Sequence, residues 1–212
     1  VFRIDHFRGF AGYYEIPASC PTAEQGVWLP GPGKALFDAI ERKLGKLPIV
    51  AEDLGLITED VVALRDACGF PGMKILQFGF GTDNNDEFLP HNWQRNFVSY
   101  TGTHDNDTVR GWWLSASEHE RTHAASYLQA DAANIHWAMI RACCDSVTNM
   151  AVFPLQDVLG LGGEHRMNVP GTIGPQNWSW RFEWPWINAE STRTLAEITA
   201  ESGRVPLASM HD

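Results

Sequence analysis

Short apolar runs and amphipathic segments alternate along this chain, and the alternation predicts its secondary structure. Apolar runs that end in polar side chains are typical of buried strands. Apolar residues spaced three and four apart, such as Phe37, Ile40 and Leu44, predict helices between them. Strands that alternate with helices favour a parallel sheet, so we expect an α/β protein. The expected strands are 1–5, 48–52, 73–79, 97–101 and 150–155, and the expected helices are 34–44, 59–68, 107–114, 118–128, 132–145 and 192–201.

Polar residues mark the expected starts of several helices. Thr58, Ser117, Asp131 and Ser191 each precede a helical segment, and their side-chain oxygens can accept a hydrogen bond from the first turn. Long stretches without periodicity separate the other elements, and long loops that follow strands are often functional. We expect irregular structure over residues 11–33, 81–96 and 159–187.

Three of the expected strands end in carboxylates. Asp5 ends the first strand, Glu52 and Asp53 end the second, and Asp105 follows His104 after the fourth. A structural ion pair could explain any one of them, but three together predict one acidic site built from several strand ends, as in (β/α) barrels. Arg3 lies two residues before Asp5 and therefore on the same face of the strand, where it would lower the pKa of that carboxyl group.

Composition narrows the classes of protein that fit this pattern. The net charge of −10 argues against a nucleic-acid partner, because such proteins present a basic face. No apolar run approaches the ~20 residues of a membrane helix, so we expect no membrane partner either. Cys20, Cys68, Cys143 and Cys144 lack metal or redox spacing and indicate a reducing, cytoplasmic setting. Nine tryptophans suit either core packing or contacts with the apolar faces of sugars.

Specific motifs contain these strand ends. The segments RIDHFRGF (3–10), VAEDLG (50–55) and YTGTHDNDT (100–108) occur in that order, and together they resemble the amylomaltase family. These enzymes are the 4-α-glucanotransferases, or disproportionating enzymes, of glycoside hydrolase family 77. Further segments that match the family are GMKILQFGF (72–80), FLPHN (88–92) and LQDVLGLGGEHRMNVPGT (155–172).

The resemblance implies a fold and a place in a larger protein. It implies a (β/α)8 TIM barrel with long loops after its strands, of which the five expected strands would be strands four to eight. Residues 1–212 would then be the C-terminal part of a glycoside-hydrolase catalytic domain whose N-terminal part is missing. The start of the chain at Val1, inside an expected strand and without an initiator methionine, agrees with that interpretation.

The resemblance also implies an activity. The chain would transfer segments of α-1,4-glucans to a glucan or glucose acceptor with retention, through a covalent glycosyl-enzyme intermediate. Its partners would be maltooligosaccharides in glycogen, starch and maltose metabolism, and it would need neither cofactor nor metal. The sequence leaves the oligomeric state open. A non-catalytic glucan-binding remnant of such an enzyme is an alternative interpretation.

Retaining transfer needs two carboxyl groups ~5 Å apart. The resemblance implies that Asp5 is the nucleophile, that Glu52 is the general acid/base and that Asp105 stabilises the transition state. The residues around Glu52 agree, because a preceding apolar run and the adjacent Asp53 would both raise its pKa. Asp53 and Asp107 themselves are expected to be supporting or capping groups. Four further residues are expected to contact the substrate: Arg3, His6, His104 and Asn168.

One short motif points to different chemistry. His119, Glu120 and His123 form a literal H-E-x-x-H, which on a helix could bind zinc and make the protein a metallohydrolase. The surrounding segment is polar, offers no apolar wall and has no third ligand nearby. We therefore expect an ordinary solvated helix face at this motif.

Overall fold

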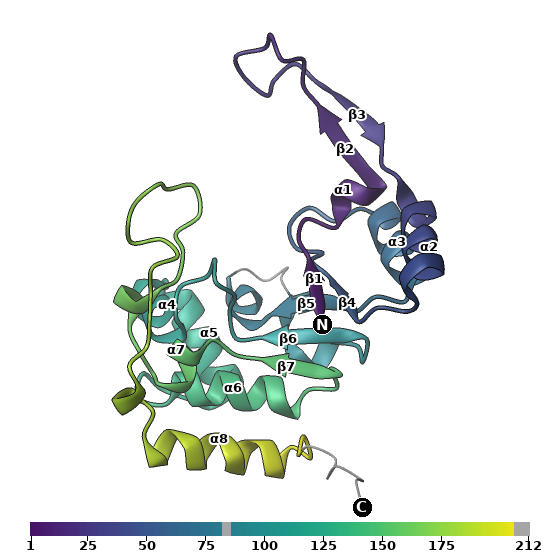
Figure 1. The fold of residues 1–212 in the computed structure, drawn as a ribbon. Coiled ribbons are helices and arrows are strands. Elements are labelled where there is room, and N and C mark those ends of the chain that lie inside the picture. The colour runs from purple at the N-terminus through teal and green to yellow at the C-terminus, as the bar shows by residue number, and fades with distance from the viewer. Residues whose placement is uncertain (82–85, 206–212) are drawn as a thin grey trace, which may run out of the picture. The chain divides into compact units, whose positions relative to one another are not determined.

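The computed structural model describes residues 1–81 and 86–205. The chain divides into two compact units (Figure 1). The N-terminal unit contains Val1–Met73 and Asn96–Val98, and the C-terminal unit contains Lys74–Arg95 and the residues from Ser99 onward. Within the described part of the chain, no helix combines the length and the apolar character needed to cross a membrane.

A pair of parallel strands positions the candidate residues of the N-terminal unit. Strand β1 (Phe2–Ile4) pairs with β4 (Ile49–Ala51), and the register sets Ile4 opposite Ala51. All three residues of β4 are buried, as its unbroken apolar sequence predicts. This register places Asp5 and Glu52 directly after a paired position, on strands roughly 4.8 Å apart.

Aromatic side chains form the core beneath this pair of strands. Phe7 is fully buried and lies next to Phe10, Phe37 and Phe70, with ring centroids 5.6 to 6.1 Å from its own. Apolar side chains from three helices complete the cluster. The chain therefore enters the core immediately after Asp5 and His6, which fixes the backbone on which both are carried. The helices are the short α1 (Arg8–Ala11), which was not predicted, and α2 (Gly33–Leu44) and α3 (Glu59–Cys68), which were.

The prediction that residues 11–33 are irregular is wrong. Strands β2 (Gly12–Glu15) and β3 (Val27–Pro30) form an antiparallel hairpin, which Figure 1 shows extending from this unit. Tyr14 and Trp28 face each other across it, with ring centroids 5.4 Å apart. Most of the hairpin is exposed on both faces, so it lacks the apolar alternation by which strands are recognised.

The next sheet contains three strands in the order β5-β6-β7. The predicted strand 73–79 is shorter than expected, because it ends at Ile75 and a 3-10 helix over Leu76–Phe80 follows. A continuous apolar run does not distinguish a strand from a buried helical turn, which explains the error. The strands are β5 (Gly72–Ile75), β6 (Phe97–Tyr100) and β7 (Met150–Val152).

Helices surround a second core in the C-terminal unit. Leu76, Phe80, Val109, Ile135 and Met139 are all fully buried there. A smaller cluster of apolar residues joins α6 to α8. The helices are α4 (Val109–Ser115), α5 (Glu118–Leu128), α6 (Ile135–Asp145), α7 (Leu155–Val158) and α8 (Ala189–Glu201).

Three helix starts differ in detail from the prediction. Ser117 caps α5 as predicted, but Thr58 makes no side-chain capping bond to α3. Asn188 rather than Ser191 caps α8, because its side-chain oxygen accepts a hydrogen bond from the Ser191 N–H. Asp131 does not cap α6, because Asn134 is the residue directly before that helix. The Asp131 carboxylate instead accepts a hydrogen bond of 2.8 Å from the Ala133 N–H in the preceding turn. Of the predicted loop 81–96, residues 82–85 lie outside the described residues, and short 3-10 helices occupy Asp86–Phe88 and Pro90–Asn92.

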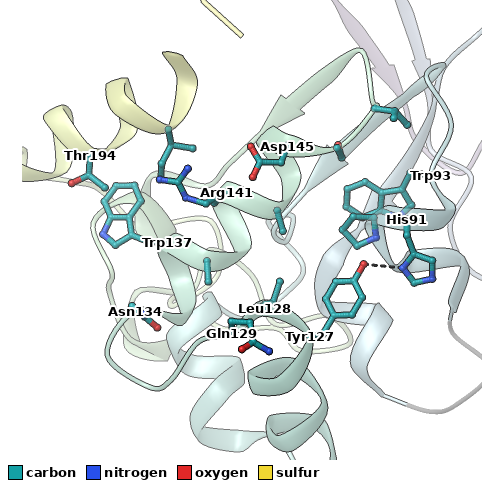
Figure 2. A pocket seen from close by; sticks show the side chains of 16 residues that line it. His91, Trp93, Tyr127, Leu128, Gln129, Asn134, Trp137, Arg141, Asp145 and Thr194 are labelled. Carbon is teal, nitrogen blue, oxygen red and sulfur yellow. Dashed lines mark hydrogen bonds between the residues drawn. The ribbon is translucent and has the colours of Figure 1, made fainter. Parts of the chain in front are cut away.

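A groove of roughly 830 Å³ runs beside α6 in the C-terminal unit (Figure 2). Trp137 and Arg141 line it from α6, and Thr194 lines it from α8. A hydrogen bond of 2.8 Å joins Tyr127 Oη and His91 Nδ1 in its lining. None of the sixteen residues that line the groove is a predicted site residue.

We predict that Phe7→Ala lowers the free energy of unfolding by about 3–5 kcal/mol, because it leaves a cavity in a fully packed aromatic cluster. The matched control is Leu44→Ala, which removes an exposed apolar side chain from α2 and should change stability by less than ~0.5 kcal/mol. Urea unfolding followed by fluorescence measures both variants. Equal effects of the two would contradict the central role of Phe7.

Candidate active site

Asp5 is the exposed member of the N-terminal group of site residues. Arg3 donates a hydrogen bond of 2.8 Å from its guanidinium to Asp5 Oδ1, which confirms the predicted contact across one face of the strand. The Asp5 side chain is 77% exposed, so this ion pair contributes little to stability. Its effect is to orient the carboxylate and leave the second oxygen open to a ligand.

Glu52 is held more tightly. One carboxylate oxygen accepts a hydrogen bond of 2.6 Å from the His6 N–H, and the other accepts one of 2.8 Å from the Leu54 N–H. Its backbone continues the pairing of β4 with β1, because the Glu52 N–H donates to Ile4 O and Glu52 O accepts from the Phe7 N–H, each at 2.9 Å. One oxygen of the carboxyl group is therefore fixed by the residue that follows Asp5, and the other by the segment that carries Glu52 itself.

The expected influence of Asp53 on Glu52 as a like charge needs correction. Asp53 is buried and paired with Arg65 at 2.5 Å, and it also accepts a hydrogen bond of 2.8 Å from the Met73 N–H. Its charge is therefore compensated. The prediction that Asp53 is a supporting group agrees with these contacts, since it joins α3 to β5. Gly72 is needed there, because a Cβ atom would collide with the Asp53 carboxylate.

His6 has an uncommon backbone conformation. Its φ is +49°, in the left-handed region that few non-glycine residues adopt. The hydrogen bond from its N–H to Glu52 and the burial of Phe7 next to it hold this conformation. Such conformations cost ~1–3 kcal/mol and are concentrated at functional sites.

In the C-terminal unit, Asp105 forms a second group with two of the predicted residues. Asn168 donates a hydrogen bond of 2.7 Å from its side-chain amide to Asp105 Oδ1, and His104 Nε2 lies 3.3 Å from Asp105 Oδ2. The sequence analysis missed Arg166, which donates a hydrogen bond of 2.5 Å to the Asp105 carbonyl. It also missed Trp178, which is largely exposed and packs against the His104 ring at 5.0 Å.

The loop that carries Asp105 is fixed internally. Asn106 Oδ1 accepts hydrogen bonds from the Thr103 N–H and hydroxyl, at 2.9 and 3.0 Å. Thr108, and not Asp107, caps α4, because its hydroxyl accepts a hydrogen bond of 3.0 Å from the Gly111 N–H. The Asp107 carboxylate instead supports the loop by accepting from the Thr108 N–H at 2.7 Å. Gln77 donates a hydrogen bond of 2.9 Å to the Asp107 carbonyl. These contacts tie the loop to its own backbone and to Gln77.

Asp157 is a further residue that the sequence analysis did not assign to the site. It lies within the segment 155–172, shortly after the last expected strand, and it is almost completely buried. Its two oxygens accept hydrogen bonds from the Thr101 hydroxyl at 2.6 Å and from the Val109 N–H at 2.8 Å. The signal available in the sequence was an acidic residue shortly after an expected strand. The hydrogen-bonding partners of that residue could not be inferred from the sequence.

The H-E-x-x-H motif has a structural explanation. Glu120 forms a capping box with Ser117, in which its carboxylate accepts a hydrogen bond of 2.7 Å from the Ser117 N–H. His123 packs edge-on against Phe80. Among the described residues, no cluster of three His, Cys, Asp or Glu side chains could hold a metal ion. The glutamate that zinc chemistry would require as a base is thus engaged in starting α5.

A pair of carboxyl groups at the ends of neighbouring parallel strands is typical of enzymes that cleave glycosidic bonds. A sequence model described as 4-alpha-glucanotransferase, glycoside hydrolase family 77, matches residues 1–188. The chain therefore belongs to the 4-alpha-glucanotransferase family, which confirms the resemblance seen in its motifs.

Individual relatives agree with this assignment. The chain is 49% identical over 207 residues to the 4-alpha-glucanotransferase of Synechocystis, which covers 96% of this chain and 41% of the relative. It is 49% identical over 210 residues to a chloroplastic/amyloplastic 4-alpha-glucanotransferase of Solanum tuberosum, and this match covers 96% of this chain and 36% of the relative. It also matches the structure of an amylomaltase from Streptococcus agalactiae in complex with acarbose, with a TM-score of 0.90 and 38% identity over 96% of this chain and 41% of that one. The chain thus spans about two fifths of the length of these relatives.

We predict that Asn168→Asp destabilises the C-terminal unit at neutral pH, because it replaces an N–H donor to Asp105 with a second negative charge. The loss relative to Asn168→Ala should be ~0.2–1 kcal/mol, the size typical of exposed charge pairs. The repulsion acts between exposed charges, so salt should screen it and the difference should shrink as the ionic strength rises to about 1 M. Urea unfolding of the two variants at pH 7.5 in low and in high salt tests this, and a difference that persists in high salt would contradict it.

Proposed function

We propose that this chain carries the catalytic carboxylates of a retaining 4-α-glucanotransferase that acts on α-1,4-glucans. The observation that carries the proposal is the pairing of β1 with β4, whose register leads directly into Asp5 and Glu52. Membership of the 4-alpha-glucanotransferase family supports it. Acarbose in the related amylomaltase structure supports a ligand built from linked sugar rings.

In the first half of the reaction, an oxygen of the Asp5 carboxylate attacks the anomeric carbon of the donor glucan. The glycosidic C–O bond breaks, and the Glu52 carboxyl proton passes to the leaving oxygen. In the second half, Glu52 removes a proton from the incoming glucan hydroxyl, whose oxygen attacks the same carbon and releases Asp5. Exposure of Asp5 supports its role as the nucleophile, and the fixed orientation of Glu52 supports its role in proton transfer.

The remaining predicted residues bind and orient the sugar in this proposal. Asp105 accepts hydrogen bonds from ring hydroxyls and stabilises the positive charge that develops in the transition state. Arg3 orients Asp5, and Asn168 and His104 orient Asp105, as their contacts support. His6 and His104 also contact the sugar. That all these groups serve one substrate stays a prediction.

The same proposal covers fold, domain and location. We propose that residues 1–212 form strands four to eight, the C-terminal part, of a (β/α)8 catalytic domain; the order of elements and the fraction of each relative that is covered support this. A cytoplasmic location fits four cysteines that are all free thiols. The relative from Solanum tuberosum is described as chloroplastic or amyloplastic.

We predict that the full-length protein disproportionates maltotriose into glucose and longer glucans, in the presence of a chelator as well as in its absence. No step of the proposed mechanism uses a metal, so EDTA should leave the rate unchanged within experimental error. Chromatographic analysis of chain lengths measures this. Binding of maltotriose without new chain lengths would indicate a glucan-binding remnant instead, and recovery of activity only with added zinc would contradict the mechanism.

We predict that Glu52→Gln traps a covalent intermediate and that Asp5→Asn does not. An α-glucosyl fluoride needs no proton on its leaving group, so Asp5 of the Glu52→Gln variant can still attack it, but the missing base prevents turnover. With natural glucans, loss of acid–base catalysis alone should reduce the rate ~10²–10⁴-fold. Intact-protein mass spectrometry and peptide mapping should find one glycosyl adduct, on Asp5. An adduct on Asp5→Asn, or one that maps to Asp105, would reverse the proposed roles.

A further inference from the structure

Asp157 holds both ends of the loop that carries His104 and Asp105. Thr101 directly follows β6, where the loop leaves the sheet, and Val109 begins α4, where the loop ends. One oxygen of Asp157 accepts from the Thr101 hydroxyl, and the other accepts from the Val109 N–H. All three residues are 0–1% exposed. One buried carboxylate thereby sets the separation between the two ends of the loop.

The Asp157 carboxylate is buried without a compensating cation. Among the described residues, no lysine, arginine or histidine side chain is hydrogen-bonded or ion-paired with it. The titratable groups that face it are Asp107, from the loop, and the Cys143 thiol, from α6, which burial keeps neutral by raising its pKa. Burial, opposed by the two hydrogen bonds and aided by the charge of Asp107, raises the pKa of Asp157 to about 6. A neutral side chain at this position would avoid the free-energy cost of burying a charge.

The ionised form suits the two contacts better than the protonated form does. A carboxylate offers only acceptors, and both of its partners here are donors. When Asp157 takes up a proton, one of its oxygens becomes a donor, so the Thr101 hydroxyl must turn to accept and its own hydrogen loses its partner. The Asp157→Asn substitution is informative because its amide, with one acceptor oxygen and one donor nitrogen, resembles that protonated state.

The geometry points to Asp157 as a positioning residue that holds the Asp105 loop in its working conformation through its two hydrogen bonds. This inference rests on the proposed function for the role of Asp105 and extends it to a residue that touches no substrate. Because burial raises the pKa of Asp157, the closed loop binds a proton more readily than an opened loop would, so acid alone does not release this contact. The chain therefore places a buried contact, made at two points, behind Asp105.

The test compares two Thr→Val substitutions that have the same size and burial. Thr101→Val removes one contact of Asp157, whereas Thr148→Val removes buried hydrogen bonds to Ser99 and Ser146, each 2.9 Å long, that do not involve the loop. In the full-length protein, Asp157→Asn and Thr101→Val should lower kcat for maltotriose disproportionation ~10–100-fold, the scale of a 1 Å misplacement. KM should change less than kcat, Thr148→Val should stay within about twofold, and Thr101→Ser should restore the rate.

Hydrogen exchange completes the test. Amide exchange over residues 102–108 should speed up in Asp157→Asn but not in Thr148→Val. Equal losses in Thr101→Val and Thr148→Val, or wild-type exchange in Asp157→Asn, would overturn the inference. Altered exchange in a protein that transfers no glucan would uphold the loop contact and reject the proposed function. If Asp157→Asn does not fold, the comparison of Thr101→Val with Thr148→Val decides alone.

Discussion

The hydrogen bond from a backbone N–H to a carboxylate is the interaction on which both groups of site residues depend. Glu52, Asp53, Asp107 and Asp157 each accept at least one such bond, at 2.6 to 2.8 Å. A carboxylate taken from water needs donors, and strand ends and first helical turns supply N–H groups that secondary structure leaves unpaired. The chain can therefore bring acidic side chains together although its net charge is −10.

The acidic residues differ in how completely these donors surround them. Asp53 and Asp157 are nearly inaccessible and use both oxygens in internal contacts, so they organise the backbone. Asp5 and Asp105 keep substantial exposure and bind side chains that leave part of the carboxylate open. Glu52 lies between these extremes, since it is fixed by two N–H groups and only partly buried. This gradation separates supporting carboxylates from those able to meet a ligand.

The sequence predicted strands and helices correctly where burial produces a clear apolar pattern. Strand β4 and helix α2 follow it, whereas α5 was predicted from its Ser117 cap. The Arg3–Asp5 contact follows from spacing along one strand. The exposed hairpin of β2 and β3 carries no such pattern. The roles of Arg166 and Asp157 depend on partners 61 and 56 positions away, and no local rule determines those distances in space. The H-E-x-x-H pattern at Glu120 was expected to be an ordinary helix face, but the sequence did not reveal that Glu120 completes a capping box with Ser117.

The distance along the chain between Asp105 and Asn168 has a consequence for synthesis. Chains emerge from the ribosome N-terminus first, so Arg3 is available to Asp5 from the start, whereas Asn168 follows Asp105 by 63 positions. Closing a loop of that length costs more entropy than a local contact does. A ribosome that stalls before Arg166 would leave a chain in which Asp105 has neither of its two hydrogen-bonding partners from that segment. Completion of the Asp105 group thus marks a chain that has been made well beyond β7.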